Sequence, residues 1–223
     1  TSQVPLYVND PVAVTAEGTP VRIVRNAETN LGDLCADAYR ALSNADIAFV
    51  NGGGIRKQIE AGDITLDDIY SVHPFGNTMC VIRVTGQQVL DALEWGARAV
   101  PSENGGFLQV SGLTYEIHTG VASSAEKDEN GMFTRVSGEY RVKNVMVGGQ
   151  PLELDKTYTL ASHNYMLLNH GDGYTMFDGC EVLGEDMMID NQVLITYITT
   201  TLGGVVGEQY ANPYGEGRIV AVE

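Results

Sequence analysis

A short apolar run that ends in three glycines constrains this chain more than any other stretch. The run ADIAFV, residues 45–50, has the length and composition of a buried strand, and NGGGIR, residues 51–56, follows it directly. Consecutive glycines cost a folded chain backbone entropy, so this position must need a compact and bare backbone. Arg56 at the end of the loop is a planar charged donor that could meet whatever approaches that backbone. The stretch therefore predicts a strand that delivers a glycine loop to a candidate binding site.

Strand and helix patterns alternate around this loop. Thr29 or Asn30 is suited to cap the first helix, and the polar stretch 119–131 is interpreted as a mobile surface loop. No linker-like change of composition and no internal repeat is visible, so we predict one α/β (α+β) domain over residues 1–223, with mixed sheets layered with helices. We expect helices over residues 31–42, 65–72, 86–100 and 188–202, strands over 45–50, 78–85, 107–118, 140–147, 158–167 and 217–222, and a loop over 168–177.

Charge and cysteine content exclude several classes of partner. With 13 Lys and Arg against 29 Asp and Glu, the net charge is −16, and no basic stripe exists to bind a nucleic-acid backbone. No apolar run approaches the length of a membrane span, and the first residues show no signal-peptide pattern. Cys35, Cys80 and Cys180 are odd in number and far apart, which argues against a disulfide framework. Cys35 and Cys80 lie in apolar patterns and are expected to be buried thiols.

Four loops combine glycine with polar or aromatic residues, and together they could recognise a purine nucleoside. Aromatic faces bind bases by stacking, and a carboxylate such as Asp172 can accept hydrogen bonds from ribose hydroxyls. Asn51 offers a donor and an acceptor to a base edge, while Arg25 and Arg56 could fork onto phosphate or a sugar oxygen. Taken singly, each loop is more often a tight turn than a ligand cradle. The four loops are VRNAETNLGDL, NGGGIR, HPFGN and NHGDGY.

Catalytic and metal-binding motifs do not appear. His163 and His170 are seven residues apart on a strand-and-loop stretch, which predicts no shared metal, and no HExxH or paired-cysteine spacing exists. No G-x-S-x-G elbow, P-loop or dinucleotide fingerprint is present either. The sequence thus predicts a binding site without metal ligands and without catalytic residues of its own.

Six stretches, in order along nearly the whole chain, resemble the C-terminal substrate-binding domain of the 5′-nucleotidase family. That family includes UDP-sugar hydrolases and 2′,3′-cyclic-nucleotide phosphodiesterases. One such stretch would mean little, whereas six in the family's order are specific. They are ETNLGDLCADA, NGGGIR, VHPFGN, VTGQQVLDALE, GGFLQVSGL and GDGYTMF.

The resemblance implies that two rings sandwich the base. Phe75 and Tyr165 match these ring positions, Asn51 matches an asparagine that contacts the base, and Asp172 matches the ribose-binding aspartate. The alternative interpretations are core aromatics for the two rings and a turn cap for Asp172.

The resemblance also implies that Gly54 and Arg56 line the same pocket and that Arg25 contacts the substrate. Two departures from the family pattern bear on this site. The segment between the second ring and Asp172 is one residue longer than in relatives, with His170 in place of a glycine, so either Tyr165 or Met166 is expected to supply the ring-side contact. Ala27 stands where the family often has an arginine, which predicts the loss of one phosphate or ribose contact.

An N-terminal metallophosphatase domain, with two divalent metal ions and motifs such as D-x-H and G-N-H-E/D, accompanies this domain in the family. Neither motif occurs here, so the sequence is expected to be a domain of a longer secreted, periplasmic or cell-wall enzyme. We expect the chain to bind the base and ribose of a nucleotide or nucleoside while the missing domain hydrolyses the phosphate ester.

Two alternatives remain open at this point. One is a free-standing nucleoside-binding module without activity, and the other is an adhesion domain in which the loops are mere turns.

Overall fold

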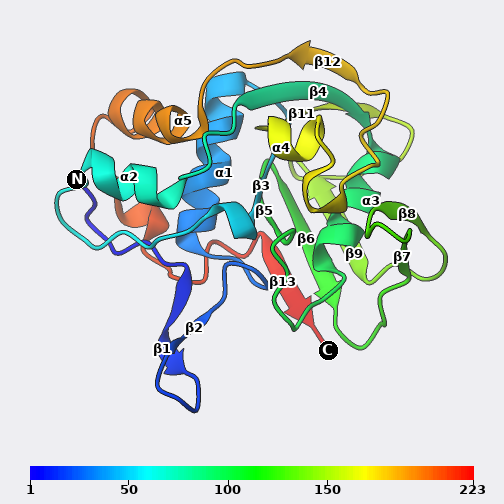
Figure 1. Ribbon diagram of the computed structural model, residues 1–223, viewed down its shortest axis with the longest axis horizontal. Helices are drawn as coiled ribbons and strands as arrows, with labels where there is room; N and C mark the ends of the chain where they lie inside the picture. Colours follow the sequence, from blue (N-terminus) through cyan, green and yellow to red (C-terminus); the bar gives the residue numbers. More distant parts are fainter.

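A five-stranded sheet forms the centre of the chain in the computed structural model, which describes residues 1–223 (Figure 1). The strand order is β12-β4-β11-β3-β5, in which β3 and β11 are parallel and the other neighbours antiparallel. Every residue of β3 is buried, and its side chains enter two apolar cores in turn, so both faces of the sheet are covered. The strands are β3 (Ile47–Asn51), β4 (Met79–Thr85), β5 (Leu108–Ser111), β11 (Thr157–His163) and β12 (Glu181–Gly184).

A second sheet of four strands has the order β10-β9-β6-β13, and its last strand runs parallel to β6. Two separate hairpins, β1–β2 and β7–β8, complete the strands, and the β1–β2 hairpin projects away from the body of the molecule (Figure 1). The bounds are β1 (Asn9–Val14), β2 (Pro20–Arg22), β6 (Leu113–His118), β7 (Ala125–Lys127), β8 (Phe133–Val136), β9 (Val142–Val147), β10 (Gln150–Pro151) and β13 (Ile219–Val222).

The three helices that follow a threonine begin where capping chemistry places them. The Thr29 hydroxyl accepts the Gly32 N–H at 3.0 Å, and Thr65 and Thr85 each form a reciprocal capping box with the third helical residue. The helices are α1 (Asn30–Ser43), α2 (Leu66–Val72), α3 (Gly86–Ala97), α4 (Asn164–Leu167) and α5 (Asp190–Thr196), and α5 continues as a π-helical turn over Tyr197–Thr201.

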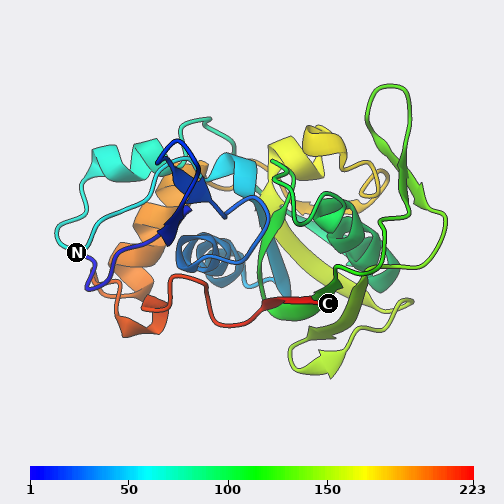
Figure 2. The ribbon, with the colours of Figure 1, turned by 90° about the horizontal axis from the view of Figure 1, so that it is seen from below.

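Helices cover the central sheet on both faces. One apolar core joins α1, α2 and α5 to one face, and the other joins α3 to the opposite face and to the second sheet. Figure 2 shows α1 end-on between the α5 side of the molecule and the sheets. None of the helices has the length and apolar character needed to cross a membrane.

The predicted mixed sheets layered with helices are confirmed, as are the four main helices and the C-terminal strand. Several details of the prediction were wrong. The single strand expected over 107–118 is two strands, β5 and β6, which belong to different sheets, because the chain turns at Gly112 with a φ of 82°. The strand expected over 158–167 ends at His163, because the next residues turn into α4. The stretch 119–131 contains β7, which pairs with β8, so it is part of a hairpin and not only a loop. Five strands were not foreseen, since among their residues only Phe133 is buried and no apolar alternation marks them. They are β1, β2, β8, β10 and β12.

Candidate functional site

A cavity of about 370 Å³ opens where β3 and β11 end and the neighbouring loops converge. This volume lies within the range of roughly 300–1,000 Å³ that is usual for small-molecule sites. Six of the seven expected residues line it, and the seventh, Arg56, does not. The lining residues are Arg25, Asn51, Gly53, Gly54, Phe75, Asn77, Gly105, Tyr165 and Asp172.

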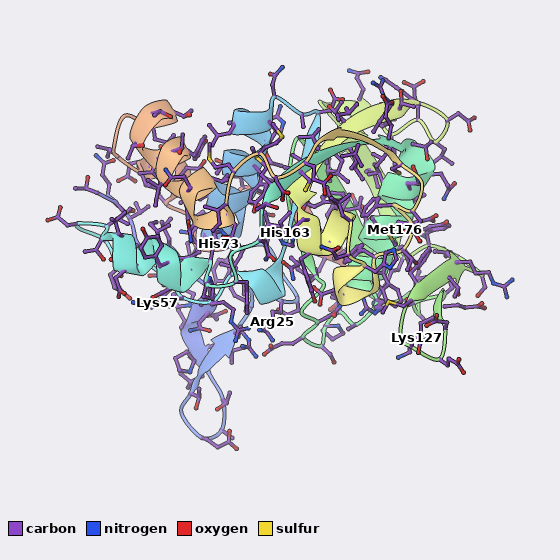
Figure 3. All side chains as sticks on the ribbon, turned by 45° about the horizontal axis from the view of Figure 1, so that its top comes forward. Arg25, Lys57, His73, Lys127, His163 and Met176 are labelled. Atoms are coloured by element: carbon purple, nitrogen blue, oxygen red, sulfur yellow. The ribbon has the colours of Figure 1, made fainter.

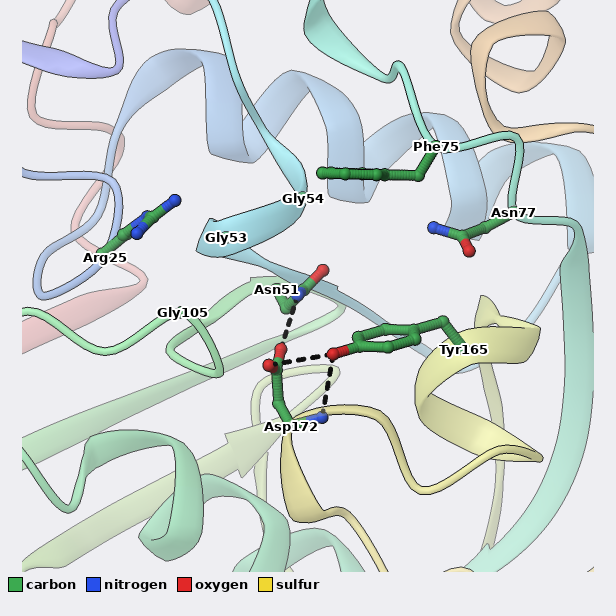
Figure 4. Close-up of a pocket in the computed structure, with 9 residues that line it drawn as sticks. All are labelled: Arg25, Asn51, Gly53, Gly54, Phe75, Asn77, Gly105, Tyr165 and Asp172. Atoms are coloured by element: carbon green, nitrogen blue, oxygen red, sulfur yellow. Dashed lines mark hydrogen bonds between the residues drawn. The ribbon is translucent and has the colours of Figure 1, made fainter.

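Two aromatic rings face the cavity from different elements. Phe75 follows α2 and is 59% exposed, and Tyr165 lies on α4 and is 39% exposed, although large aromatic side chains usually bury their surface. Figure 4 shows the two rings on opposite sides of the pocket. Met166, the alternative to Tyr165, is fully buried in the core below α4 and has no access to the cavity. The structure thus places Tyr165 at the cavity, and the extra residue before Asp172 does not displace it.

A hydrogen-bonded carboxylate forms the polar floor of the cavity. Asn51 Nδ2 donates to Asp172 Oδ2 at 2.6 Å, and the Tyr165 hydroxyl lies 3.2 Å from Asp172 Oδ1 (Figure 4). Trp95 Nε1 donates to the Asp172 carbonyl at 2.9 Å, which holds the backbone from below. Asp172 has a φ of 55°, so this left-handed turn is costly for a residue with a side chain and must be held by its surroundings.

One arginine faces the cavity and a second lies beside it. Arg25 lines the cavity, and its buried Nε has no hydrogen-bond partner within the protein. Burial, followed by repulsion from Arg22 and Arg56, lowers the pKa of Arg25. Arg56 is exposed, donates to the Gly53 carbonyl at 3.2 Å, and places its guanidinium 5.8 Å from the Phe75 ring centroid. Arg56 is therefore not among the residues that line the cavity in this structure, and its side chain lies beside Phe75 and its own loop.

The three glycines after β3 leave no room for a side chain, because other parts of the protein pack closely against them. A Cβ on Gly52 would lie 2.1 Å from the Val24 carbonyl oxygen, and one on Gly53 would lie 2.9 Å from the Gly105 carbonyl oxygen. A Cβ on Gly54 would meet the Asn51 side chain at 2.6 Å. Close approach of the Val24 and Gly105 backbone and of the Asn51 side chain accounts for the glycines, and Gly53 and Gly54 line the cavity with backbone alone.

We expect Gly52→Ala to destabilise the protein. The added methyl has no room against the Val24 backbone, and overpacking of this kind costs about 1–3 kcal/mol or more. Denaturant unfolding followed by circular dichroism would measure the loss. Gly120→Ala is the matched control, because nothing lies within 4 Å of its Cβ position, and its stability should be unchanged. Equal stability of the two variants would contradict this account of the glycine turn.

Two buried histidines lie behind the cavity, and neither is charged in the fold. Figure 3 labels both of them together with Arg25. Burial lowers the pKa of His73 to about 4 and that of His163 to about 3. Their pKa in the unfolded chain is about 6.5, so below that pH the unfolded state binds more protons than the folded state. Each histidine therefore supports stability above about pH 6.5 and loses this contribution as the pH falls.

This dependence is best measured as a difference between variants. Burial raises the pKa of Asp33 to about 9. The contribution of Asp33 to stability therefore increases as the pH falls, which is opposite to the contribution of the histidines and would mask it in the natural chain alone. We expect the free energy of unfolding of the natural chain, relative to that of His73→Asn, to fall by about 2 kcal/mol between about pH 7 and about pH 5. A difference that stays constant over this interval would show that His73 titrates normally in the fold.

The sequence prediction missed three lining residues, Gly53, Gly105 and Asn77. Asn77 belongs to HPFGN, a stretch singled out for its ring, and its side chain extends toward the space between Phe75 and Tyr165 (Figure 4). Its backbone N–H and carbonyl both bond to Asp190, which fixes the loop and leaves the amide side chain for the cavity. The sequence signal for Asn77 was its place in the HPFGN turn, two residues after the Phe75 ring.

The donor groups of this chain do not fit a metal centre. No group of three or more His, Cys, Asp or Glu side chains is positioned to hold an ion, so the two divalent ions expected for the family find no site among these residues. The cavity offers rings, amides, one carboxylate and one guanidinium, which suits binding of a flat polar ligand.

Comparisons with known proteins identify the family of this mixed-sheet domain. The family model "5′-nucleotidase, C-terminal domain" matches residues 11–179, and the chain belongs to this family. The trifunctional nucleotide phosphoesterase protein YfkN of Bacillus subtilis is 36% identical over 203 residues, which cover 89% of this chain and 13% of that protein. A 5′-nucleotidase of Vibrio parahaemolyticus is 35% identical over 178 residues, covering 79% of this chain and 28% of the relative.

A solved structure agrees with these relatives. The 5′-nucleotidase precursor from Thermus thermophilus superposes with a TM-score of 0.78 at 31% identity, over all of this chain and 39% of that one. The chain thus spans only a minor part of the proteins it matches. The predicted resemblance to the C-terminal domain is confirmed.

Proposed function

We propose that this chain is the substrate-binding domain of a 5′-nucleotidase-type phosphoric ester hydrolase and that its cavity holds a nucleotide or nucleoside. The observation that carries the proposal is the pair of exposed rings, Phe75 and Tyr165, on opposite sides of one glycine-walled cavity. A base inserted between them stacks on both faces, at about 1–3 kcal/mol per stacking contact.

Polar groups around the rings supply the remaining contacts. The Asp172 carboxylate has about four acceptor sites, of which Asn51 and Tyr165 use two, so two remain for the ribose hydroxyls. Asn77 has a free amide for the base edge, and Asn51 retains one N–H and one lone pair toward the ligand. Arg25, whose buried Nε has no hydrogen-bond partner in the protein, is available to a phosphate or sugar oxygen, and Arg56 lies at the rim beside Phe75.

The chemistry of hydrolysis is assigned to another part of the polypeptide. In this proposal an N-terminal metallophosphatase domain with two divalent ions is the partner, and this chain contributes orientation by holding base and ribose. No nucleic acid is a partner, since the net charge is −16. We place the protein outside the cell, in the periplasm or at the cell wall, because its Thermus relative is described as a precursor; fractionation with antibody detection tests this.

Ligand-observed NMR tests the binding proposal directly. Saturation transfer from the chain to adenosine, AMP, UMP and UDP-glucose should reach the base protons and rank the ligands. The same samples with added divalent metal should release no phosphate. Transfer to none of the ligands would contradict the binding role. Metal-dependent hydrolysis that survives purification would contradict the proposal that a separate domain hydrolyses the phosphate ester.

A further inference from the structure

A buried histidine touches the polar floor of the cavity from behind. His163, the last residue of β11, is 3% exposed, and its Nε2 lies 3.0 Å from Asn51 Oδ1. Asn51 in turn donates to Asp172 at 2.6 Å. Asn51 therefore stands in the middle of a short chain of hydrogen bonds that runs from the core to the carboxylate.

The chemistry of these groups fixes every proton in the chain. A carboxylate only accepts hydrogen bonds, so the Asn51 NH₂ group must face Asp172 and the Asn51 oxygen must face His163. The amide oxygen only accepts as well, so His163 must carry its proton on Nε2. The other ring nitrogen, Nδ1, is buried without a hydrogen-bond partner in the protein, and burial keeps the ring neutral.

We infer that His163 is a positioning residue for ribose recognition: it holds the Asn51 amide in the orientation that keeps the Asp172 carboxylate aimed into the cavity. This inference rests on the proposed function. Without a donor at position 163, the buried Asn51 oxygen loses its hydrogen bond, and the amide is free to move away from the position in which its NH₂ group reaches Asp172. Asp172 then keeps only Tyr165 as a side-chain donor, on a backbone turn that is itself strained.

The experiment compares two ligands that differ only in the groups that Asp172 would bind. Adenosine and 2′,3′-dideoxyadenosine share the base, and hydrogen bonds to a charged acceptor predict that the natural chain prefers adenosine by roughly 10- to 150-fold. In His163→Leu we expect this preference to fall at least about fivefold, with the dideoxy affinity nearly unchanged. In His163→Gln we expect it to be retained, because the Gln amide can donate from nearly the position of Nε2.

A matched control separates positioning from general destabilisation. Leu160→Val changes a fully buried residue of the same strand in the opposite core, away from Asn51. It should lower stability and leave the ligand preference unchanged. The inference is overturned if His163→Leu keeps the natural preference, or if Leu160→Val reduces it equally.

A second measurement uses the natural chain and needs no folded variant. The ¹⁵N shifts of the His163 ring should report a proton on Nε2 and a bare Nδ1. The reverse tautomer would overturn the inference even if nucleosides bind. Failure of the natural chain to bind adenosine would instead contradict the proposed function, and the tautomer would still decide whether His163 holds Asn51.

Discussion

Phe75→Ala is expected to weaken adenosine binding by roughly 5- to 150-fold, because it removes one of the two stacking faces, worth about 1–3 kcal/mol. Stability should change little, since the Phe75 ring is 59% exposed and supports little of the core. Titration calorimetry measures the affinity, and thermal unfolding measures the stability. This combination separates a binding ring from a core ring, for which the opposite result is expected.

Tyr70→Ala provides the matched control. Tyr70 is also an exposed aromatic residue, 48% exposed on α2, but it does not line the cavity. Its removal should leave adenosine affinity unchanged. If both variants lose adenosine affinity equally, Phe75 has no specific role in binding, and the assignment of the cavity as the binding site is wrong.

Asp37→Ala is expected to cost about 3 kcal/mol of stability, near the lower end of the range for breaking a buried ion pair. Asp37 on α1 accepts both terminal nitrogens of Arg218, at 2.7 and 2.9 Å, and the Arg218 side chain is only 13% exposed. The Tyr210 hydroxyl also donates to Asp37 at 2.9 Å. Removal of the carboxylate leaves the buried guanidinium with the Val110 carbonyl at 2.9 Å, Glu216 at 3.3 Å and Asp33, whose Oδ1 lies 3.6 Å from Nε, but without its two-pronged carboxylate partner.

Denaturant unfolding monitored by circular dichroism checks this value. Glu126→Ala breaks a pair with Arg135 that is just as short, 2.7 Å, but both side chains are exposed, so little measurable change is expected. If the two variants lost similar amounts of unfolding free energy, burial of the Asp37–Arg218 pair would not add to its contribution to stability.

Much of the fold could be predicted from the sequence, because local chemistry and apolar periodicity agree along α1, α2, α3, β3 and β4. Threonine caps set the helix starts, and buried strands appear as short apolar runs. The hairpin strands escaped prediction because they are short and only Phe133 among their residues is buried, so pairing rather than apolar alternation defines them. The turn into α4 escaped for a similar reason: His163 and Asn164 carry no helix signal of their own, and contacts such as Asn164 Oδ1 with the Thr78 N–H fix the chain there.

The sequence predicted most of the residues that line the candidate site, but it did not predict the contacts between their side chains. Loop residues such as Phe75 and Asp172 could be named from motifs, and both line the cavity. The position of Arg56 beside Phe75 and the contact of His163 with Asn51 depend on side-chain directions that no spacing encodes. Asn77 lay within a recognised motif, but only the three-dimensional arrangement distinguishes a free amide from a turn former.

The contacts of β13 and of the residues just before it have a consequence for how the protein folds during synthesis. The β13 strand joins β6 about a hundred residues away along the sequence, and the Ile219 N–H bonds to Glu28 beside α1. Ser2 likewise pairs with Val206. Contacts between such distant residues slow folding, because large loops must close before they form. During synthesis, Asp33 and Asp37 of α1 therefore stay without their buried partner until Arg218 has left the ribosome, and a chain stalled shortly before Arg218 would expose these carboxylates to the protein quality-control machinery.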